Sequence, residues 1–456
     1  MTHRPAPLSR RTFLMTSAAA VLVSACATQA GTGSLPTPSL APTMTNLLAA
    51  QAMPIRRLAA DDPGVKALAR RLSGARIAGL GEATHGSHED ALLKSVLIQS
   101  MVENHELRLI LLEANRTGCA QLDAYASAAP TGRLAAEAVK EAPVFRILKT
   151  EVIADLLEWL RGWNAVNGDR RVRVVGVDCQ ASSQDAADAL AALAAIDSGA
   201  ADALGVALAP ILSAEALAAR HDRMLKTITS AQRAEAETAC RMLEAELTSA
   251  GLDGPAFAAR LAWQGLNAFE HETSDGDLTL ATPEYWSRRD VFMADNAVFL
   301  ARDEAAVFWG HNAHVAGGNP AGDSAGYVPS GAVLRRKLGR NYAVLIQEFA
   351  EAAFLAIPTE DGLPPDTPLV RIERTARPGT LNALLADASA QTAWFDLANL
   401  PESSVTQDWR RTPIGLDWYG YAANAEPRGS DILKVPPESL FDLLVIHPKL
   451  TPSRML

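Results

Sequence analysis

Residues 76–90 read RIAGLGEATHGSHED, a short apolar run that passes through a glycine-rich turn into a polar segment. Residues 76–80 have the length and apolar character of a buried strand. Gly79 and Gly81 allow the backbone to approach closely at the turn, and the polar groups that follow fall at the entry to a helix. The stretch therefore predicts a strand, a tight polar turn and a helix, which is the first unit of an α/β fold.

Further short runs rich in β-branched and apolar residues follow along the chain, separated by longer stretches of helix-forming composition. They are residues 108–112, 172–177, 305–309, 342–346 and 443–446. This alternation is typical of a parallel sheet whose strands are joined by crossover helices. The predicted fold class is α/β, with a mainly parallel sheet.

The pattern changes between residue 184 and about residue 272, where the chain is rich in Ala, Leu and Glu and contains no convincing strand. Pro210, Gly251 and Pro255 interrupt this segment. Helix-forming composition divided by such breaks indicates several helices in succession. We expect a helical insertion or cap within the α/β domain, which should span residues 51–456.

The amino-terminal residues 1–26 have the features of an export signal. A basic stretch with Arg10 and Arg11 runs into an apolar segment over residues 13–25, which is too short to span a bilayer as a folded helix. SRRTFL at residues 9–14 resembles a twin-arginine signal, and VSAC at residues 23–26 resembles a lipoprotein cleavage site with Cys26 acylated. We expect export by the twin-arginine route, a lipid anchor in the cell envelope and a flexible tether over residues 27–50.

Composition excludes some classes of partner and site. The chain has 456 residues, 48% of them hydrophobic, and 52 acidic against 42 basic residues give a net charge of −10. Without a Lys/Arg cluster in the domain, a nucleic-acid partner is not expected. Cys119, Cys179 and Cys240 show no CxxC spacing, which argues against a zinc knot or a disulfide scaffold, so each is expected to be a small buried side chain.

Chemically capable side chains follow several of the predicted strands. His85 follows the first, Glu113 the second, Asp178 the third, and His311 and His314 the fourth. The carboxyl ends of neighbouring parallel strands line one crevice, so these residues should converge there. The sequence lacks a phosphate loop and a His-Glu-x-x-His motif. Gly-x-Ser-x-Gly occurs once, as GDSAG at residues 322–326, but it does not directly follow a predicted strand, as a nucleophile elbow requires. What remains is His85 three residues after Glu82, a spacing with which a carboxylate can orient an imidazole as a general base for water.

Several short blocks of this sequence resemble those of the erythromycin esterase family. The resemblance runs in order from about residue 55 to residue 456 and is carried by short blocks. These are GEATHG at 81–86, LEA at 112–114, GVDCQ at 176–180, RD at 289–290 with MADN at 293–296, WGHNAH at 309–314 and TPSR at 451–454.

The resemblance implies an α/β hydrolase of esters that works without a metal or other cofactor. By that likeness His85 activates water, Glu82 is its neighbour and Glu113 is a second acidic group. His311 or His314 would stabilise the developing oxyanion. The family commonly has an arginine nine residues after the catalytic histidine, where this chain has Lys94. Lysine keeps the charge but lacks the bidentate fork.

Each candidate residue also has a structural interpretation. His85 could cap the following helix, Glu113 could pair with Lys94 or Arg116, and Lys94 could be a solvated helix residue. Three further residues are candidates for substrate binding. His88 could instead face solvent, Asp178 could be a helix N-cap, and Trp418 could be an ordinary packed aromatic side chain.

The sequence therefore predicts an exported, lipid-anchored hydrolase of a small-molecule carboxylic ester or lactone, with macrolide resistance as one role. Membrane contact would be through the lipid alone. One alternative is a metal-dependent hydrolase, because the histidines and acids include enough ligands for a site. The other is a surface lipoprotein that binds a ligand without chemistry.

Overall fold

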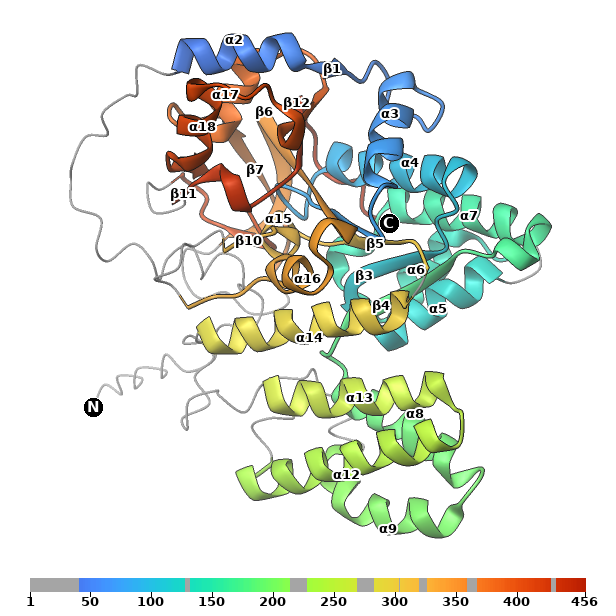
Figure 1. Cartoon of the computed structure of the whole chain (residues 1–456). Coiled ribbons are helices and arrows are strands. Elements are labelled where there is room, and N and C mark those ends of the chain that lie inside the picture. The colour runs from blue at the N-terminus through green and yellow to red at the C-terminus, as the bar shows by residue number, and fades with distance from the viewer. Residues whose placement is uncertain are drawn as a thin grey trace, which may run out of the picture.

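The computed structural model describes residues 41–456 except 128–131, 214–227, 269–282, 303, 320–325, 359–366 and 428–431. A ten-stranded sheet forms the centre of the molecule, and its main path runs β1-β8-β12-β6-β2-β5-β3-β4 (Figure 1). The six strands expected from the sequence lie next to one another in this path. They are β2 (Ile77–Leu80), β3 (Leu109–Asn115), β4 (Arg173–Asp178), β5 (Ala306–Trp309), β6 (Tyr342–Pro358) and β12 (Leu443–Leu450).

These six strands pair in parallel throughout, from β12 to β4. The predicted fold class, an α/β fold with a mainly parallel sheet, is therefore confirmed. Shorter strands that the sequence did not reveal extend the sheet at one end and beside β6. They are β1 (Met53–Pro54), β7 (Val370–Thr375), β8 (Ala393–Asp396) and β10 (Ala422–Ala423), while β9 (Ile414–Leu416) and β11 (Leu433–Val435) form a separate antiparallel pair.

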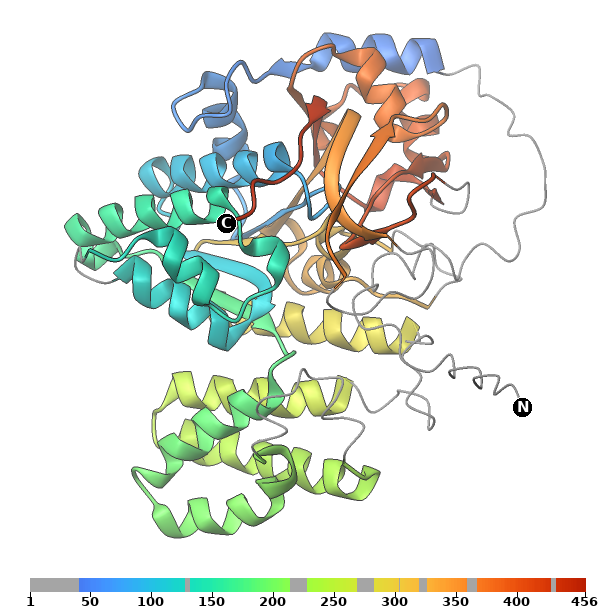
Figure 2. The ribbon, with the colours of Figure 1, turned by 180° about the vertical axis from the view of Figure 1, so that it is seen from behind.

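Helices cover both faces of the sheet because its central strands are apolar on both sides. Alternate residues of one strand, such as Leu109 and Ile110, belong to different core clusters. One face packs with α3 (Pro63–Leu72), α4 (His88–Asn104), α5 (Arg116–Ser127), α6 (Ala135–Glu141) and α7 (Glu151–Val166) (Figure 2). The other packs with α2 (Ala41–Gln51), α14 (Pro283–Ala301), α15 (Asn312–Val315), α16 (Ser330–Leu338), α17 (Leu381–Ala388) and α18 (Ser404–Arg411).

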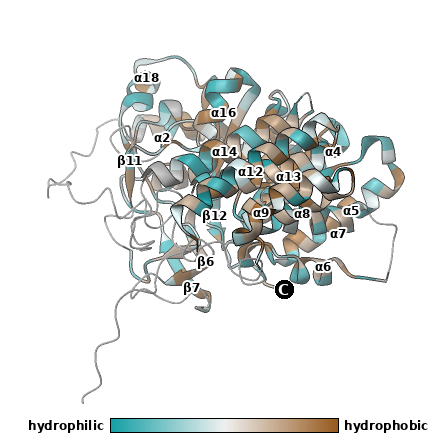
Figure 3. Cartoon of the chain, turned by 90° about the horizontal axis from the view of Figure 1, so that it is seen from below, coloured by the Kyte–Doolittle hydropathy of each residue, from teal (hydrophilic) through white to brown (hydrophobic). Residues whose placement is uncertain are grey.

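Four helices form a separate lobe after β4, with a hydrophobic core of their own. They are α8 (Ser182–Ala194), α9 (Ser198–Leu208), α12 (Ser230–Ser249) and α13 (Asp253–Ala268). Figure 3 shows both brown and teal residues in this lobe, and buried hydrophobic residues form its core. Helix α14 then leads back to the sheet.

The amino-terminal end of the described chain differs from the expected tether. Residues 41–51 form α2, and Met44 and Leu48 on this helix are buried in the core. The last residues of the stretch expected to be flexible are thus packed, because Met44 and Leu48 lie one turn apart and present one apolar face. The expected signal and Cys26 lie outside the described residues.

Two further features of the described chain concern its cysteines and its helices. Cys119, Cys179 and Cys240 are buried and unbridged, as predicted. No described helix has both the length and the apolar character needed to cross a membrane.

Candidate active site

The turn after β2 brings its polar residues against the neighbouring strands. A Cβ at Gly81 would lie 2.2 Å from Asn312 Oδ1, and one at Gly86 would lie 1.9 Å from the carbonyl oxygen of Leu355. Only glycine fits at these positions unless the neighbouring atoms move, and at Gly86 those atoms belong to the backbone. The glycines thus let Glu82 and His85 sit directly at the carboxyl edge of the sheet.

Glu82 joins His85 to Lys94. The imidazole Nδ1–H of His85 donates to Glu82 Oε1 at 2.5 Å, and Lys94 Nζ donates to Glu82 Oε2 at 2.6 Å. A carboxylate only accepts hydrogen bonds, so this contact places the proton of neutral His85 on Nδ1 and leaves Nε2 with a lone pair. The predicted carboxylate–imidazole arrangement is present, with Lys94 behind it.

Lys94 is fully buried, so the interpretation as a solvated helix residue is wrong. Its ammonium also donates to the carbonyl oxygen of Gly310 at 3.0 Å and lies 4.8 Å from the centre of the Trp309 ring. Burial alone would raise the pKa of Glu82, but the Lys94 charge and the His85 hydrogen bond outweigh it and lower that pKa to about 2. Burial lowers the pKa of Lys94, and Glu82 opposes the shift. The pair holds Glu82 ionised at neutral pH.

His311 lies against His85 but has no spare donor. The two ring centroids are 4.9 Å apart. His311 Nε2–H donates to the carbonyl oxygen of Tyr419 at 3.1 Å, and Nδ1 accepts from the backbone N–H of Ala313 at 3.2 Å. Burial, reinforced by His85 and His314, lowers the pKa of His311 to about 3. This ring is therefore neutral, and both of its nitrogens are already occupied.

His314 lies on the other side of Glu113 and is charged. Its Nδ1 is 2.8 Å from Asp290 Oδ1 and its Nε2 is 3.0 Å from Glu113 Oε1. Burial would lower the pKa of His314, but the charges of Asp290 and Glu113 outweigh it and raise the pKa to about 10. Both histidines thus lie within the site, yet neither ring holds an uncommitted N–H for an oxyanion.

Glu113 is held by groups other than those the sequence suggested. It accepts the backbone N–H of His311 at 3.0 Å and contacts Arg289 Nη2 at 3.3 Å. The pairing with Lys94 or Arg116 was wrong, because Lys94 binds Glu82 while Arg116 pairs with Asp185 of the helical lobe. Glu113 comes within reach of Arg289 only through α14, which is far away in sequence.

Asp178 and Trp418 are placed in structural positions. Asp178 is fully buried with Arg289 Nη2 at 2.6 Å, and the helix after it begins behind Ala181, so neither substrate binding nor an N-cap describes it. Trp418 is 4% exposed and donates from Nε1 to buried Glu348 at 2.7 Å. The substrate-binding role expected of Trp418 is corrected to core packing, because Glu348 supplies an inward acceptor for the indole.

His88 begins α4 beside the turn and is half-buried. Its backbone N–H donates to the carbonyl oxygen of Thr451 at 2.8 Å, which ties the carboxyl-terminal segment to the turn. A contact with substrate stays a prediction for this ring.

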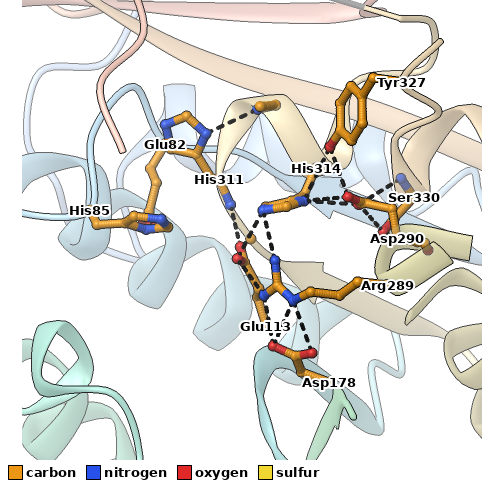
Figure 4. Close-up of polar contacts among 12 residues, drawn as sticks. Glu82, His85, Glu113, Asp178, Arg289, Asp290, His311, His314, Tyr327 and Ser330 are labelled. Carbon is orange, nitrogen blue, oxygen red and sulfur yellow. Dashed lines mark hydrogen bonds and ion pairs between the residues drawn. The ribbon is translucent and has the colours of Figure 1, made fainter. Parts of the chain in front are cut away.

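Sequence reasoning missed a set of residues behind His314 that Figure 4 shows around one carboxylate. Asp290 accepts from Tyr327 Oη at 2.8 Å and from Ser330 Oγ at 2.5 Å, and all three side chains are buried. Arg289 and Asp290 lie within the blocks that carried the family resemblance, which was the available signal. Their roles depend on how α14 packs against the sheet.

The contacting group around His85 and His314 is close to charge balance. Four carboxylates (Glu82, Glu113, Asp178 and Asp290) face three cations (Lys94, Arg289 and His314). Among the described residues, no three His, Cys, Asp or Glu side chains are grouped as ligands for a metal ion.

Solved structures show the same fold. A protein from Bacillus cereus is similar with a TM-score of 0.76 and 19% sequence identity, and the match covers 91% of this chain and 99% of that protein. A succinoglycan biosynthesis protein is similar with a TM-score of 0.78 and 16% sequence identity, and the match covers 92% of this chain and 100% of that protein. A mutant of the erythromycin esterase EreC in its open conformation is similar with a TM-score of 0.60 and 20% sequence identity, and the match covers 84% of this chain and 93% of that protein.

Sequence comparison identifies the family. No curated protein matches the chain. The erythromycin esterase family, in contrast, matches residues 102–450, a span that includes Glu113, Arg289, Asp290 and both histidines after β5. The chain therefore belongs to the erythromycin esterase family.

Proposed function

We propose that this protein hydrolyses carboxylic esters or lactones with water activated by His85. The observation that carries the proposal is the 2.5 Å contact between His85 Nδ1 and Glu82 Oε1. It orients the ring, leaves Nε2 as the basic atom and places a fixed negative charge behind the imidazolium that forms. Family membership supports a hydrolase of this class.

In the proposed reaction, His85 Nε2 takes a proton from water as the water oxygen attacks the ester carbonyl carbon. The carbonyl π bond breaks, and its oxygen becomes the tetrahedral oxyanion. When the carbonyl re-forms, the bond to the alkoxide oxygen breaks, and His85 returns its proton to that oxygen. Glu82 and Lys94 remain an ion pair throughout, so Glu82 stabilises the imidazolium by its charge.

The sequence led us to expect His311 or His314 to stabilise the oxyanion, but neither ring has a free N–H for it. The N–H of His311 is bonded to the Tyr419 carbonyl, and both N–H groups of His314 face carboxylates. A direct hydrogen bond from His311 would require its bond to Tyr419 to open when substrate binds. We assign His314 the role of a fixed positive charge in the network that supports the site.

The substrate class is tested by a panel of simple esters, lactones and macrolides with the intact purified protein. We expect turnover of at least one member, identified by mass spectrometry: a lactone should give a ring-opened product heavier by one water, and a simple ester should give an acid and an alcohol whose masses sum to those of the ester and one water. A macrolide in that set would support a role in macrolide resistance. Binding of panel members without any turnover would favour the non-catalytic surface lipoprotein instead.

Activity should not depend on a dissociable metal ion. Prolonged dialysis against a chelator is expected to leave turnover of the best panel ester unchanged, because the proposed base is oriented by a carboxylate. The control is the same dialysis without chelator. Loss of activity that zinc or manganese restores would make the metal-dependent hydrolase the better account.

Anchoring through Cys26 remains part of the proposal and rests on the signal pattern at residues 9–26. In a host with lipoprotein processing, the mature protein should begin at Cys26 and fractionate with membranes, whereas Cys26→Ser should not be cleaved there. Mass spectrometry of the amino-terminal peptide measures both the start and the acyl mass. A mature start elsewhere without lipid would refute the anchor.

A further inference from the structure

A second carboxylate lies behind His314, outside the set of residues that the proposed reaction uses. Asp290, on α14, contacts His314 Nδ1 at 2.8 Å with Oδ1 and at 3.1 Å with Oδ2. Opposite it, Glu113 from β3 lies 3.0 Å from Nε2. His314 is thus held between two carboxylates that come from different elements (Figure 4).

This geometry determines the charge of His314. A neutral imidazole has one N–H, so it would leave a ring lone pair facing one of the two carboxylates. Only the imidazolium can donate to both at once. The other ionisable and charged groups that face it are Arg289 from α14, Tyr327 from the segment before α16, His311 from its own turn and, behind Arg289, Asp178 from β4.

Asp290 itself is fixed by donors on its remaining lone pairs. Tyr327 Oη donates to Oδ2 at 2.8 Å, and Ser330 donates to Oδ1 from its backbone N–H at 2.9 Å and from Oγ at 2.5 Å. The Ser330 hydroxyl also contacts the backbone oxygen of Asp290 at 2.9 Å. The carboxylate is fully buried and has no alternative position within this shell.

The contacts continue from His314 to the proposed base. Glu113 Oε1 contacts His314 Nε2, and Glu113 Oε2 accepts a hydrogen bond from the backbone N–H of His311. The centroid of the His311 ring lies 4.9 Å from that of the His85 ring. If His314 were neutral with its proton on Nδ1, Glu113 Oε1 would face a ring lone pair and would lose one of its donors, so the backbone N–H of His311 and Arg289 alone would hold it. The proton that Asp290 retains on His314 therefore contributes to the placement of Glu113 on that turn.

We propose that Asp290 is a positioning residue of the active site, which keeps His314 a permanent imidazolium and thereby fixes Glu113 on the turn that carries His311. This inference rests on the proposed ester hydrolysis at His85. Asp290 touches no reacting atom in it. Its effect on turnover passes through His314 and Glu113.

The charge state is measured directly by nuclear magnetic resonance of the full chain with isotope-labelled histidine. His314→Gln identifies the signal of His314. In the parent, this ring should stay doubly protonated from about pH 6 to about pH 9, beyond the range of an ordinary histidine. A His314 signal that titrates near neutrality in the parent would overturn the proposal, and no Asp290 variant is needed for that result.

Turnover of the best ester from the panel gives the second readout. Asp290→Asn should bring the loss of the His314 proton into the assayed range, so its activity relative to the parent should fall about tenfold per pH unit above the new transition. Near pH 6 most of the parent activity should return, because protonation restores the bond to Glu113. A purely structural role would lower activity by the same factor at every pH.

The matched control is Asp295→Asn on the same helix, where Asp295 pairs with Lys337 away from the site. It should leave the pH profile and the His314 signal unchanged. A pH-independent defect in a folded Asp290→Asn protein would overturn the positioning role. If the proposed ester hydrolysis itself is wrong, the parent protein will show no turnover while its His314 signal still reports a doubly protonated ring, so the two failures can be told apart.

Discussion

Replacing His85 by alanine is expected to lower turnover by about 10²–10⁴-fold, the usual contribution of a positioned general base. The structure leaves Nε2 of this ring as the basic atom, because Nδ1 donates to Glu82 at 2.5 Å. The side chain lies on a turn and is not fully buried, so the variant should fold. The measurement is kcat on the best ester of the panel, together with the thermal unfolding curve.

A control for histidine removal is His105→Ala at the far end of α4, which should retain parent activity. Near-parent turnover by a well-folded His85→Ala protein would contradict the assignment. Equal losses in both variants would show that the effect is not specific to the base.

Replacing Lys94 by methionine should have the second large effect, on stability as well as activity. The substitution leaves Glu82 buried without its cation, which costs about 3–5 kcal/mol when one partner of a buried pair is removed. In the parent, the pKa of Glu82 is lowered from 4.5 to about 2. The pair therefore stabilises the fold fully above about pH 4.5, and this contribution is lost as the pH falls through about 2.

Without Lys94, the pKa of Glu82 should rise, so the carboxylate would be protonated at a higher pH and would cease to support His85 there. The acidic limb of the pH–rate profile should move upward accordingly. Chemical denaturation at neutral pH measures the stability loss, and kcat/KM against pH measures the limb. An unchanged profile in the methionine variant would exclude Lys94 from the function of the site.

Lys94→Arg is the matched variant, because it keeps the charge and adds a second donor toward Glu82. It should retain or raise activity and keep the parent's acidic limb. A loss in the arginine variant as large as in the methionine variant would mean that the shape of the buried pocket beside Trp309 matters more than the charge.

The central strands could be predicted because they are short, apolar and separated by helical stretches. Residues 77–80 and 306–309 are buried throughout, so their sequence is apolar without a break. Strand β6 extends to Pro358, well beyond the expected residue 346, since Gln347 and Glu348 interrupt the apolar run although both are buried. Strands β7 and β8 were hidden because short segments with a mixed pattern resemble loops.

The site was partly predictable for a related reason. The sequence places Glu82, His85 and Glu113 at strand ends, and the topology of a parallel sheet brings such ends together. The partners of those groups come from elsewhere: Arg289 and Asp290 lie on α14. The protonation of His314 depends on that tertiary contact, so no local pattern could indicate it.

The central claim is that water, deprotonated by His85, attacks the carbonyl carbon of an ester. A single turnover with excess enzyme in water labelled with heavy oxygen tests it, with mass spectrometry of product and protein at successive times. We expect one heavy oxygen in the carboxylate of the product and an unmodified protein mass throughout. An acylated protein that precedes the product, or heavy oxygen in the alcohol, would contradict the account.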